Sequence, residues 1–250
     1  MIEVFPSTTN EEKLIKGIQK SIGSLEDGII GTQTLSDIAC ILKSIDKPIT
    51  LKIYDMPVII SKNLVPFMPK GKKLSGWNNT INGSFLSGKT PCSILIADGW
   101  IYYGASCHSY YNKPETVLYR LVNGTVGIKR AKSAIELPDG VKWAIGGLGL
   151  LNFYNPEAEG FCKCTDGYKT EDFSDVLRRT NHSMIGYKNG YFYQVLCLNK
   201  SAKEVNEAAE LLGLEYAIML DGGHLAAING TEDFAKINSN CAQYYAVQGE

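Results

Sequence analysis

The stretch IGYKNGYFYQVLCL, residues 185–198, places two β-type runs on either side of the dipeptide Asn189-Gly190. Asn-Gly suits the two positive-φ positions of a tight hairpin turn, so this stretch predicts two adjacent antiparallel strands. Asp98-Gly99 and Asn123-Gly124 lie between β-rich runs in the same way. Three such hairpins predict a sheet rich in antiparallel strands and argue against a doubly wound parallel fold.

A helix is expected where the sequence after this hairpin changes character. Residues 201–204, Ser-Ala-Lys-Glu, form a capping box, and an apolar stripe at helical spacing follows them. Gly213 is a suitable end for this helix. The chain then enters a short β-type run at residues 215–219.

A second helical region is expected near the N-terminus. Residues 11–45 carry apolar side chains at helical spacing on both sides of a glycine-containing turn, and Lys47-Pro48 interrupts the pattern. We therefore expect an α+β fold, an antiparallel-rich mixed sheet with packed helices, in residues 48–250. A small helical module in residues 1–47 is expected to precede it.

The composition argues against several classes of partner. The chain has 250 residues, with 25 basic and 26 acidic side chains and a formal net charge of −1. This balance gives no reason to expect nucleic acid as a partner. The longest apolar run, residues 143–151, is far shorter than the roughly 20 residues of a membrane helix, so no membrane span is expected. The N-terminus lacks the pattern of a signal peptide, which predicts synthesis in the cytoplasm.

A candidate site follows the β-type run at residues 215–219. The next residues are Leu220-Asp221-Gly222-Gly223, which include an acid followed by two glycines. Glycines let backbone N–H groups turn toward an anion, and successive N–H groups form a concavity that suits one. His224, one of three histidines, comes next. The alternative is a plain strand-to-turn connection in which Asp221 bonds its own backbone.

Four segments of the sequence occur in a characteristic order. They are Ile81-Asn82-Gly83-Ser84-Phe85, residues 144–151 with Gly146-Gly147, residues 178–186 (RRTNHSMIG), and Leu220-Asp221-Gly222-Gly223. This order, over residues 80–230, resembles the phosphodiester glycosidase family. The resemblance implies a hydrolase that cleaves a glycosyl phosphodiester or a related bacterial cell-wall glycan bond.

The sequence departs from the family pattern in two places. The family has Asp-Gly-Gly-Gly-Ser at the last segment, where this chain has His224 and a leucine instead of the third glycine and the serine. The family also has Arg-Thr before an Ile-Gly pair, where this chain has His182 and Ser183, with Arg178 and Arg179 upstream. Two explanations stay open, a changed substrate or a loss of turnover.

The resemblance and the residue chemistry together indicate roles for these residues. A departing phosphate monoester is a weak base, so the reaction needs little acid catalysis, but the site must accommodate phosphate charge. Asp221 is the candidate that activates water or stabilises the oxocarbenium-like transition state, and His182 and His224 are candidates for proton transfer. The candidates for binding the substrate and its phosphate are Asn82, Gly83, Gly147, Arg178, Arg179, Ser183, Gly222 and Gly223.

Each binding candidate also has a structural interpretation. Asn82-Gly83 suits an ordinary turn, Arg178-Arg179 a solvated pair, and Gly147 a place where strands pack closely. No cofactor is implied by these residues, and a role for a divalent cation stays open.

Residues 27–34, DGIIGTQT, are similar to the peptidoglycan-binding helical domain of cell-wall hydrolases. The resemblance implies peptidoglycan as a partner of residues 11–45, and an unrelated helical hairpin is the alternative. A wall enzyme without a signal peptide would be released by host lysis, as phage-encoded enzymes are. Two other functions stay open: a non-catalytic protein that binds a sugar phosphate or nucleotide-like ligand, and a glycosidase of the peptidoglycan backbone.

Overall fold

The computed structural model describes residues 47–161 and 176–250 of the chain. From Pro48 onward these residues belong to one compact unit, residues 48–250. The helical module expected in residues 1–47, with its peptidoglycan partner, falls on residues outside the described part. The module, its partner and the domain boundary at Lys47 therefore stay predictions.

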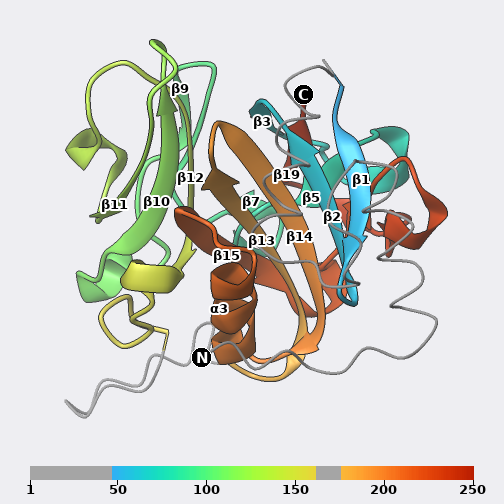
Figure 1. Ribbon diagram of the computed structural model, residues 1–250. Helices are drawn as coiled ribbons and strands as arrows, with labels where there is room; N and C mark the ends of the chain where they lie inside the picture. The colour runs from blue at the N-terminus through green and yellow to red at the C-terminus, as the bar shows by residue number, and fades with distance from the viewer. Residues whose placement is uncertain (1–46, 162–175) are drawn as a thin grey trace. The chain divides into compact units, whose positions relative to one another are not determined.

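Most strands of the described chain form one large antiparallel sheet (Figure 1). Eight strands follow one another in the order β1-β2-β14-β13-β15-β12-β10-β11, and β8 pairs with both β12 and β9. Their bounds are β1 Ile49–Ile53, β2 Met56–Ser61, β8 Leu95–Ala97, β9 Trp100–Tyr103, β10 Glu115–Leu121, β11 Val126–Ala131, β12 Val141–Gly149, β13 Thr180–Lys188, β14 Tyr191–Lys200 and β15 Tyr216–Gly222.

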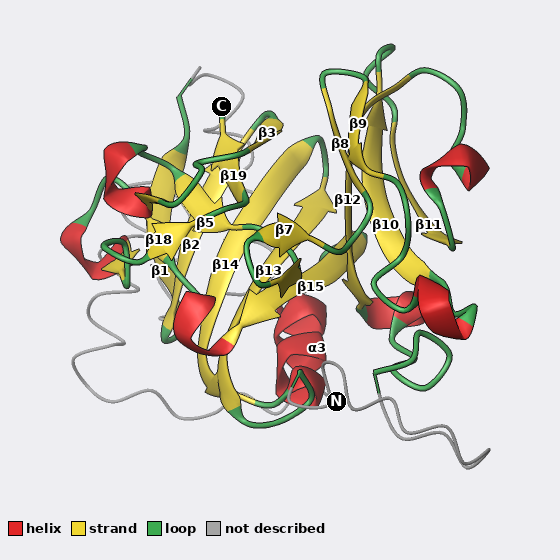
Figure 2. Cartoon of the chain, turned by 180° about the vertical axis from the view of Figure 1, so that it is seen from behind, coloured by secondary structure: helices red, strands yellow, loops and turns green. Residues whose placement is uncertain are grey.

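A second sheet of five short strands has the order β17-β16-β5-β19-β3, and Figure 2 shows it from behind. Its strands are β3 Leu64–Phe67, β5 Thr80–Asn82, β16 Ile228–Asn229, β17 Lys236–Ile237 and β19 Ala246–Gly249. Two further pairs join β4 Lys72–Lys73 with β18 Ala242–Gln243, and β6 Leu86–Ser87 with β7 Thr90–Pro91.

The expected α+β class is wrong. Among the described residues the only α-helix is α3, Ala202–Leu211, and every strand pair is antiparallel, so the fold is mostly β and its sheets are not mixed. Single 3₁₀ turns complete it: η1 Leu74–Gly76, η2 Ser109–Tyr111, η3 Ala134–Glu136, η4 Leu151–Phe153, η5 Gly223–Leu225 and η6 Asp233–Ala235. No helix in this part of the chain is long and apolar enough to cross a membrane.

The β13–β14 hairpin forms where its turn predicts it. Lys188 lies opposite Tyr191, and the two central residues, Asn189 and Gly190, have φ of 51° and 87°. Positive φ at both positions gives the turn a twist that matches the right-handed twist of the strands. The helix α3 also forms as expected: Ser201 accepts from the Glu204 N–H, and the Glu204 carboxylate accepts from the Ser201 N–H.

The two sheets share one hydrophobic core. Its members come from β8, β10, β12, β13, β14 and β15 of the large sheet, from β3, β5 and β19 of the small one, and from the residue before β19: Leu64, Ile81, Leu95, Leu118, Trp143, Ile145, Ile185, Phe192, Ile218, Leu220, Tyr245 and Val247. Buried apolar area is the main driving force for such packing, at roughly 25 cal/mol per Å². The core thereby fixes β5 of the small sheet beside β15 of the large one, which is where the candidate site lies.

Candidate functional site

The candidate site is built at the carboxyl end of β15, where Asp221 and Gly222 are half-buried. The Asp221 carboxylate Oδ1 accepts a hydrogen bond from the Gly222 N–H at 2.7 Å. Gly223 follows with φ of +63°, in the left-handed region that favours glycine. The strand ends there, and the chain turns away into η5.

Asn82 joins three separated segments beneath Asp221. Its Nδ2 donates to the carbonyls of Gly83 and Asp221, both at 3.0 Å. Its Oδ1 accepts from the Ser183 hydroxyl at 2.5 Å and from the Ala227 N–H at 2.9 Å. A side-chain amide has two N–H donors and two acceptor lone pairs, so these four bonds use its full capacity. Asn82 is 1% exposed, and its geometry gives it a positioning role under the site.

Gly83 and Ser183 belong to this same support. The Gly83 carbonyl accepts from the Asp221 N–H at 3.3 Å, which holds the end of β15 against β5. A Cβ at position 83 would lie 2.2 Å from the Tyr245 ring, so only glycine fits there. Ser183 is fully buried on β13, and its hydroxyl donates a hydrogen bond to Asn82 Oδ1.

His182 lies beside Asp221 because β13 pairs with β15. The register places His182 opposite Gly222, and an irregularity between His182 and Met184 shifts the pairing at this point. His182 Nε2 is 3.0 Å from the Arg178 carbonyl oxygen. A carbonyl only accepts, so Nε2 carries the proton, and in the neutral ring Nδ1 is the atom with the lone pair.

Gly222 lets His182 approach this closely. A Cβ at position 222 would lie 2.7 Å from His182 Nδ1 and 2.8 Å from the Asn181 carbonyl oxygen. Any side chain there would displace the ring. The glycine is thus required for packing against the imidazole, which is an additional reason for the Asp-Gly-Gly sequence.

A small pocket opens at this point. Its lining residues come from the ends of β13 and β15 and from the segment before β13: Val176, Thr180, His182, Leu220, Asp221, Gly222 and Gly223. It encloses about 40 Å³. A single water needs roughly 10–15 Å³ of such a cavity. The pocket therefore suits the reacting atoms or a phosphate-sized group rather than a whole disaccharide.

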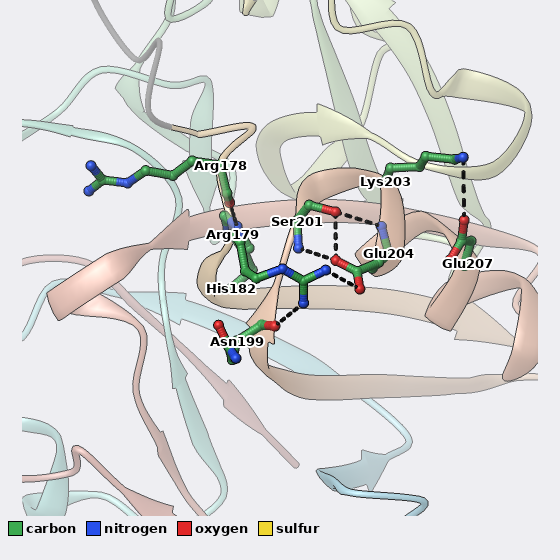
Figure 3. A network of polar contacts seen from close by, with 8 residues as sticks. All are labelled: Arg178, Arg179, His182, Asn199, Ser201, Lys203, Glu204 and Glu207. Carbon is green, nitrogen blue, oxygen red and sulfur yellow. Dashed lines mark hydrogen bonds and ion pairs between the residues drawn. The ribbon is translucent and has the colours of Figure 1, made fainter.

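The two arginines lie differently from a phosphate clamp (Figure 3). Arg179 donates through Nη1 to the Asn199 carbonyl at 2.8 Å and through Nη2 to Glu204 Oε1 at 2.6 Å. The pKa of Glu204 is lowered to about 2, first by hydrogen bonds from the Ser201 N–H and hydroxyl and then by Arg179. Arg179, the residue before β13, is therefore held by the end of β14 and the start of α3. The Arg178 side chain is exposed and extends away from this network.

The remaining candidates lie outside the pocket. His224 is exposed on η5, and its carbonyl accepts from Asn238 Nδ2 at 2.7 Å. Gly147 lies within β12, where a Cβ would be 2.5 Å from the Met219 carbonyl oxygen, so this glycine permits close packing of β12 on β15. The structure thus brings Asp221, His182, Gly222 and Gly223 together, supports them with Asn82, Gly83 and Ser183, and places the arginines, His224 and Gly147 elsewhere.

Three pocket residues, Val176, Thr180 and Leu220, were not among the candidates from sequence. Thr180 and Val176 line the pocket, and Thr180 directly follows the Arg178-Arg179 pair, so its place in that segment was the available signal. Val176 carries no chemical signal at all.

A buried carboxyl group, also missed, lies behind the site. Glu115 is fully buried and accepts from the Ser93 hydroxyl and the Ile94 N–H. Ser93 Oγ is 3.4 Å from the hydroxyl of Ser84, which directly follows Gly83. Burial raises the pKa of Glu115 to about 7, although its hydrogen bonds act in the opposite direction. An acid at the start of the apolar run ETVLYRL was the sequence signal for a partnered, buried group.

Glu159 is a second carboxyl of this kind. It accepts from the N–H and hydroxyl of Thr116, at 3.1 and 2.8 Å, and lies 3.4 Å from Arg130 Nε. Burial raises its pKa to about 7 as well. Within residues 47–161 and 176–250, no group of three or more His, Cys, Asp or Glu side chains is placed to hold a metal ion.

Comparison with known proteins gives a likeness of fold. No family model matches the chain, and no curated protein matches it in sequence. One similar solved structure is the catalytic domain of zebrafish N-acetylglucosamine-1-phosphodiester alpha-N-acetylglucosaminidase, auto-inhibited by its pro-peptide, which is 11% identical over 82% of each chain with a TM-score of 0.57. A hypothetical protein from Synechocystis is also 11% identical, with a TM-score of 0.50, over 80% of this chain and 61% of that one. The chain therefore shares, distantly, the fold of a glycosidase catalytic domain.

Proposed function

We propose that this chain is a hydrolase that cleaves a glycosyl phosphodiester, with Asp221 and His182 acting at the pocket they line. The observation that carries the proposal is the joining of distant segments by one buried amide: Asn82 bonds the end of β15, β13 and the chain after η5. Such a support holds a half-buried acid beside an imidazole, which is a usual arrangement for catalysis. The fold shared with a glycosidase catalytic domain agrees with a hydrolase.

In the proposed reaction, Asp221 stabilises positive charge that develops on the anomeric carbon. Water attacks this carbon, the carbon–oxygen bond to the phosphate breaks, and the phosphate monoester leaves with the bonding electrons. His182, whose ring lines the pocket, accepts the proton of the attacking water. The Thr180 hydroxyl and the Gly223 N–H belong to the same pocket and are donors for a phosphate oxygen or a sugar hydroxyl.

The small volume of the pocket supports this class of substrate. About 40 Å³ holds the reacting centre and leaves the rest of the substrate outside. A phosphate leaving group needs little general acid, and the structure places no second carboxyl of the described chain in the pocket lining beside Asp221. A glycosidase of the peptidoglycan backbone would need such an acid for its poorer leaving group, so phosphodiester cleavage fits this lining better.

The test is release of N-acetylglucosamine from the α-linked N-acetylglucosamine methyl phosphodiester by the full chain. We expect turnover by the wild type and a fall in kcat of at least about 100-fold in Asp221→Asn, because a positioned acid or base typically contributes that much. His182→Gln should fall comparably. Asp233→Asn, which changes an exposed aspartate that pairs with Lys236, is the matched control and should keep wild-type rates. Equal rates for the wild type and Asp221→Asn would overturn the proposal.

One observation favours the non-catalytic alternative, a protein that binds a sugar phosphate. Arg179 is engaged by Asn199 and Glu204 and does not line the pocket, so the anion has no described arginine to bind. Calorimetry with N-acetylglucosamine 1-phosphate, combined with the assay above, separates the two. Saturable binding with no product over hours would select the binding protein and end the hydrolase proposal.

A further inference from the structure

A second, larger cavity lies apart from the Asp221 pocket and shares none of its lining residues. It encloses about 210 Å³ between β3, the β8–β9 turn, the start of β12 and the carboxyl end of β19. Ligand pockets for drug-sized molecules are about 300–1,000 Å³, so this one suits a smaller ligand such as a single ring. Asn63, Val65, Ala97 and Trp143 are among its lining residues.

Strand pairing places an exposed aromatic ring beside this cavity. Ala97, which lines the cavity, is directly opposite Trp100 in the β8–β9 pair. Side chains of directly opposed residues point to the same face of a sheet, so Trp100 projects on the face that the cavity occupies. Trp100 is 76% exposed, although tryptophan is usually well covered. Figure 2 shows β8 and β9 beside β12.

Trp143 forms part of the wall of the cavity. The β8–β12 register pairs Ile96 with Ala144, so the next residues, Ala97 and Trp143, are neighbours across the two strands. Trp143 is 2% exposed, and its indole Nε1 is itself buried. Its ring therefore contributes packing to the wall, and hydrogen bonds to a ligand come from the other lining residues.

The charges of the lining do not select an anion. Lys142 contributes one positive charge, and Asp98 and Glu250 contribute two negative ones. The amide of Asn63 is held between Glu250 Oε2, at 3.4 Å, and Arg120 Nη1, at 2.6 Å. With Arg120 beside the lining the charges balance, so they give no net attraction for a phosphate, and carboxylates and amides suit hydroxyl groups as partners.

We propose that this cavity is an accessory saccharide site that takes one neutral, hydroxyl-rich sugar ring. Trp100 covers one face of the ring at the rim, as aromatic side chains cover apolar faces of ligands, and the carboxylates of Asp98 and Glu250 accept hydrogen bonds from its hydroxyl groups. The site goes beyond the proposed hydrolysis and does not depend on it, because no residue of the Asp221 pocket takes part.

The experiment follows the indole N–H signals of the full-length chain by ¹H–¹⁵N NMR during titration with N-acetylglucosamine. The chain has three tryptophans, and single Trp→Phe variants assign their three signals. We expect the Trp100 and Trp143 signals to shift saturably with one dissociation constant, while the Trp77 signal stays in place. Trp100→Ala should weaken binding about tenfold, equivalent to about 1.4 kcal/mol.

Two variants separate binding from folding and from the other pocket. Val65→Phe, at a partly exposed lining position, should fill the cavity and abolish the shifts while thermal unfolding stays near that of the wild type. Asp221→Asn should leave the shifts unchanged. Tyr110→Ala, which removes a 92% exposed ring elsewhere, is the matched control for Trp100→Ala and should bind as the wild type does.

Three results would overturn the saccharide site. They are a Trp143 signal that does not move at saturating sugar, wild-type affinity in both Trp100→Ala and Val65→Phe, and a marked preference of these signals for N-acetylglucosamine 1-phosphate over the neutral sugar. None of them bears on hydrolysis at Asp221, so the failure of either proposal is recognised separately.

Discussion

Asn82 shows how one side chain can fix a site without touching a ligand. Replacing it with alanine leaves the buried Ser183 hydroxyl and the Ala227 N–H without their acceptor and the Asp221 carbonyl without its donor. Each buried group left unsatisfied costs about 1–3 kcal/mol, so we expect Asn82→Ala to lower the free energy of unfolding by about 3 kcal/mol or more. Urea denaturation measures this change.

The matched control is Asn78→Ala, which changes an exposed asparagine four residues earlier and should alter stability by less than about 0.5 kcal/mol. If Asn82→Ala were as stable as Asn78→Ala, the four hydrogen bonds would not be supporting β15. The positioning role assigned to Asn82 would then have to be withdrawn.

The protonation of Glu115 makes stability depend on pH. Burial raises its pKa from an ordinary 4.5 to about 7, so the folded state holds a proton that the unfolded chain releases earlier. The stability from this group is fully present below about pH 4.5 and is lost as pH rises through 7. A shift of this size corresponds to roughly 3 kcal/mol over that range.

We therefore expect Glu115→Gln to flatten the decline in stability between pH 5 and pH 8, as followed by urea denaturation at each pH. Glu159→Gln should do the same, because its pKa is raised in the same direction. Glu207→Gln, at an exposed position of α3, should keep the wild-type profile. A Glu115→Gln profile that runs parallel to the wild type would show that Glu115 is ionised in the folded protein.

At the scale of elements, α3 begins at a complete capping box, and Arg179, the residue before β13, donates a hydrogen bond to its Glu204 carboxylate. Ser201→Ala removes the acceptor of the Glu204 N–H and should destabilise the protein by about 1 kcal/mol. Thermal unfolding, with Lys203→Ala as control, measures it. Lys203 forms only an exposed pair with Glu207 at 3.9 Å, and such pairs contribute little. Equal melting temperatures for the two variants would contradict a stabilising cap.

The hairpin turns show what local sequence can predict. Asp98-Gly99 and Asn189-Gly190 both adopt positive φ at the two central positions, as their residue types favour. Asn123-Gly124 also connects two antiparallel strands, but only Gly124 has positive φ and the loop spans residues 122–125. Strand order was thus predictable at each hairpin, whereas turn geometry was predictable only where the strands extend right up to the dipeptide.

The candidate site shows the limits of the same reasoning. Asp221, Gly222, Gly223 and His182 were found from residue chemistry and motif order, and the structure places them in one pocket. Arg179 was expected at a phosphate, but it pairs with Glu204, 25 residues further along the chain. No local pattern shows which of two possible partners a long, charged side chain meets.

At the scale of the whole molecule, the sequence predicted the antiparallel sheet and its one described α-helix but not the class of fold. An α+β class was expected for residues 48–250, but α3 is the only α-helix among the described residues, and the rest of that part is strands, turns and loops. Single hairpins also give no sign that β3, β5 and β19 form a second sheet on a shared core. That arrangement depends on pairs far apart in the chain, such as β5 with β16 and β19.

The most direct test of the central claim, that distant segments build one substrate pocket at Asp221, is an amide ¹H–¹⁵N shift map of the full chain with N-acetylglucosamine 1-phosphate. We predict that the largest saturable shifts occur at Thr180, His182, Gly222 and Gly223, and that Asn82→Ala, if folded, weakens them. Shifts confined to other surfaces, or no saturable shift at these four amides, would contradict the claim.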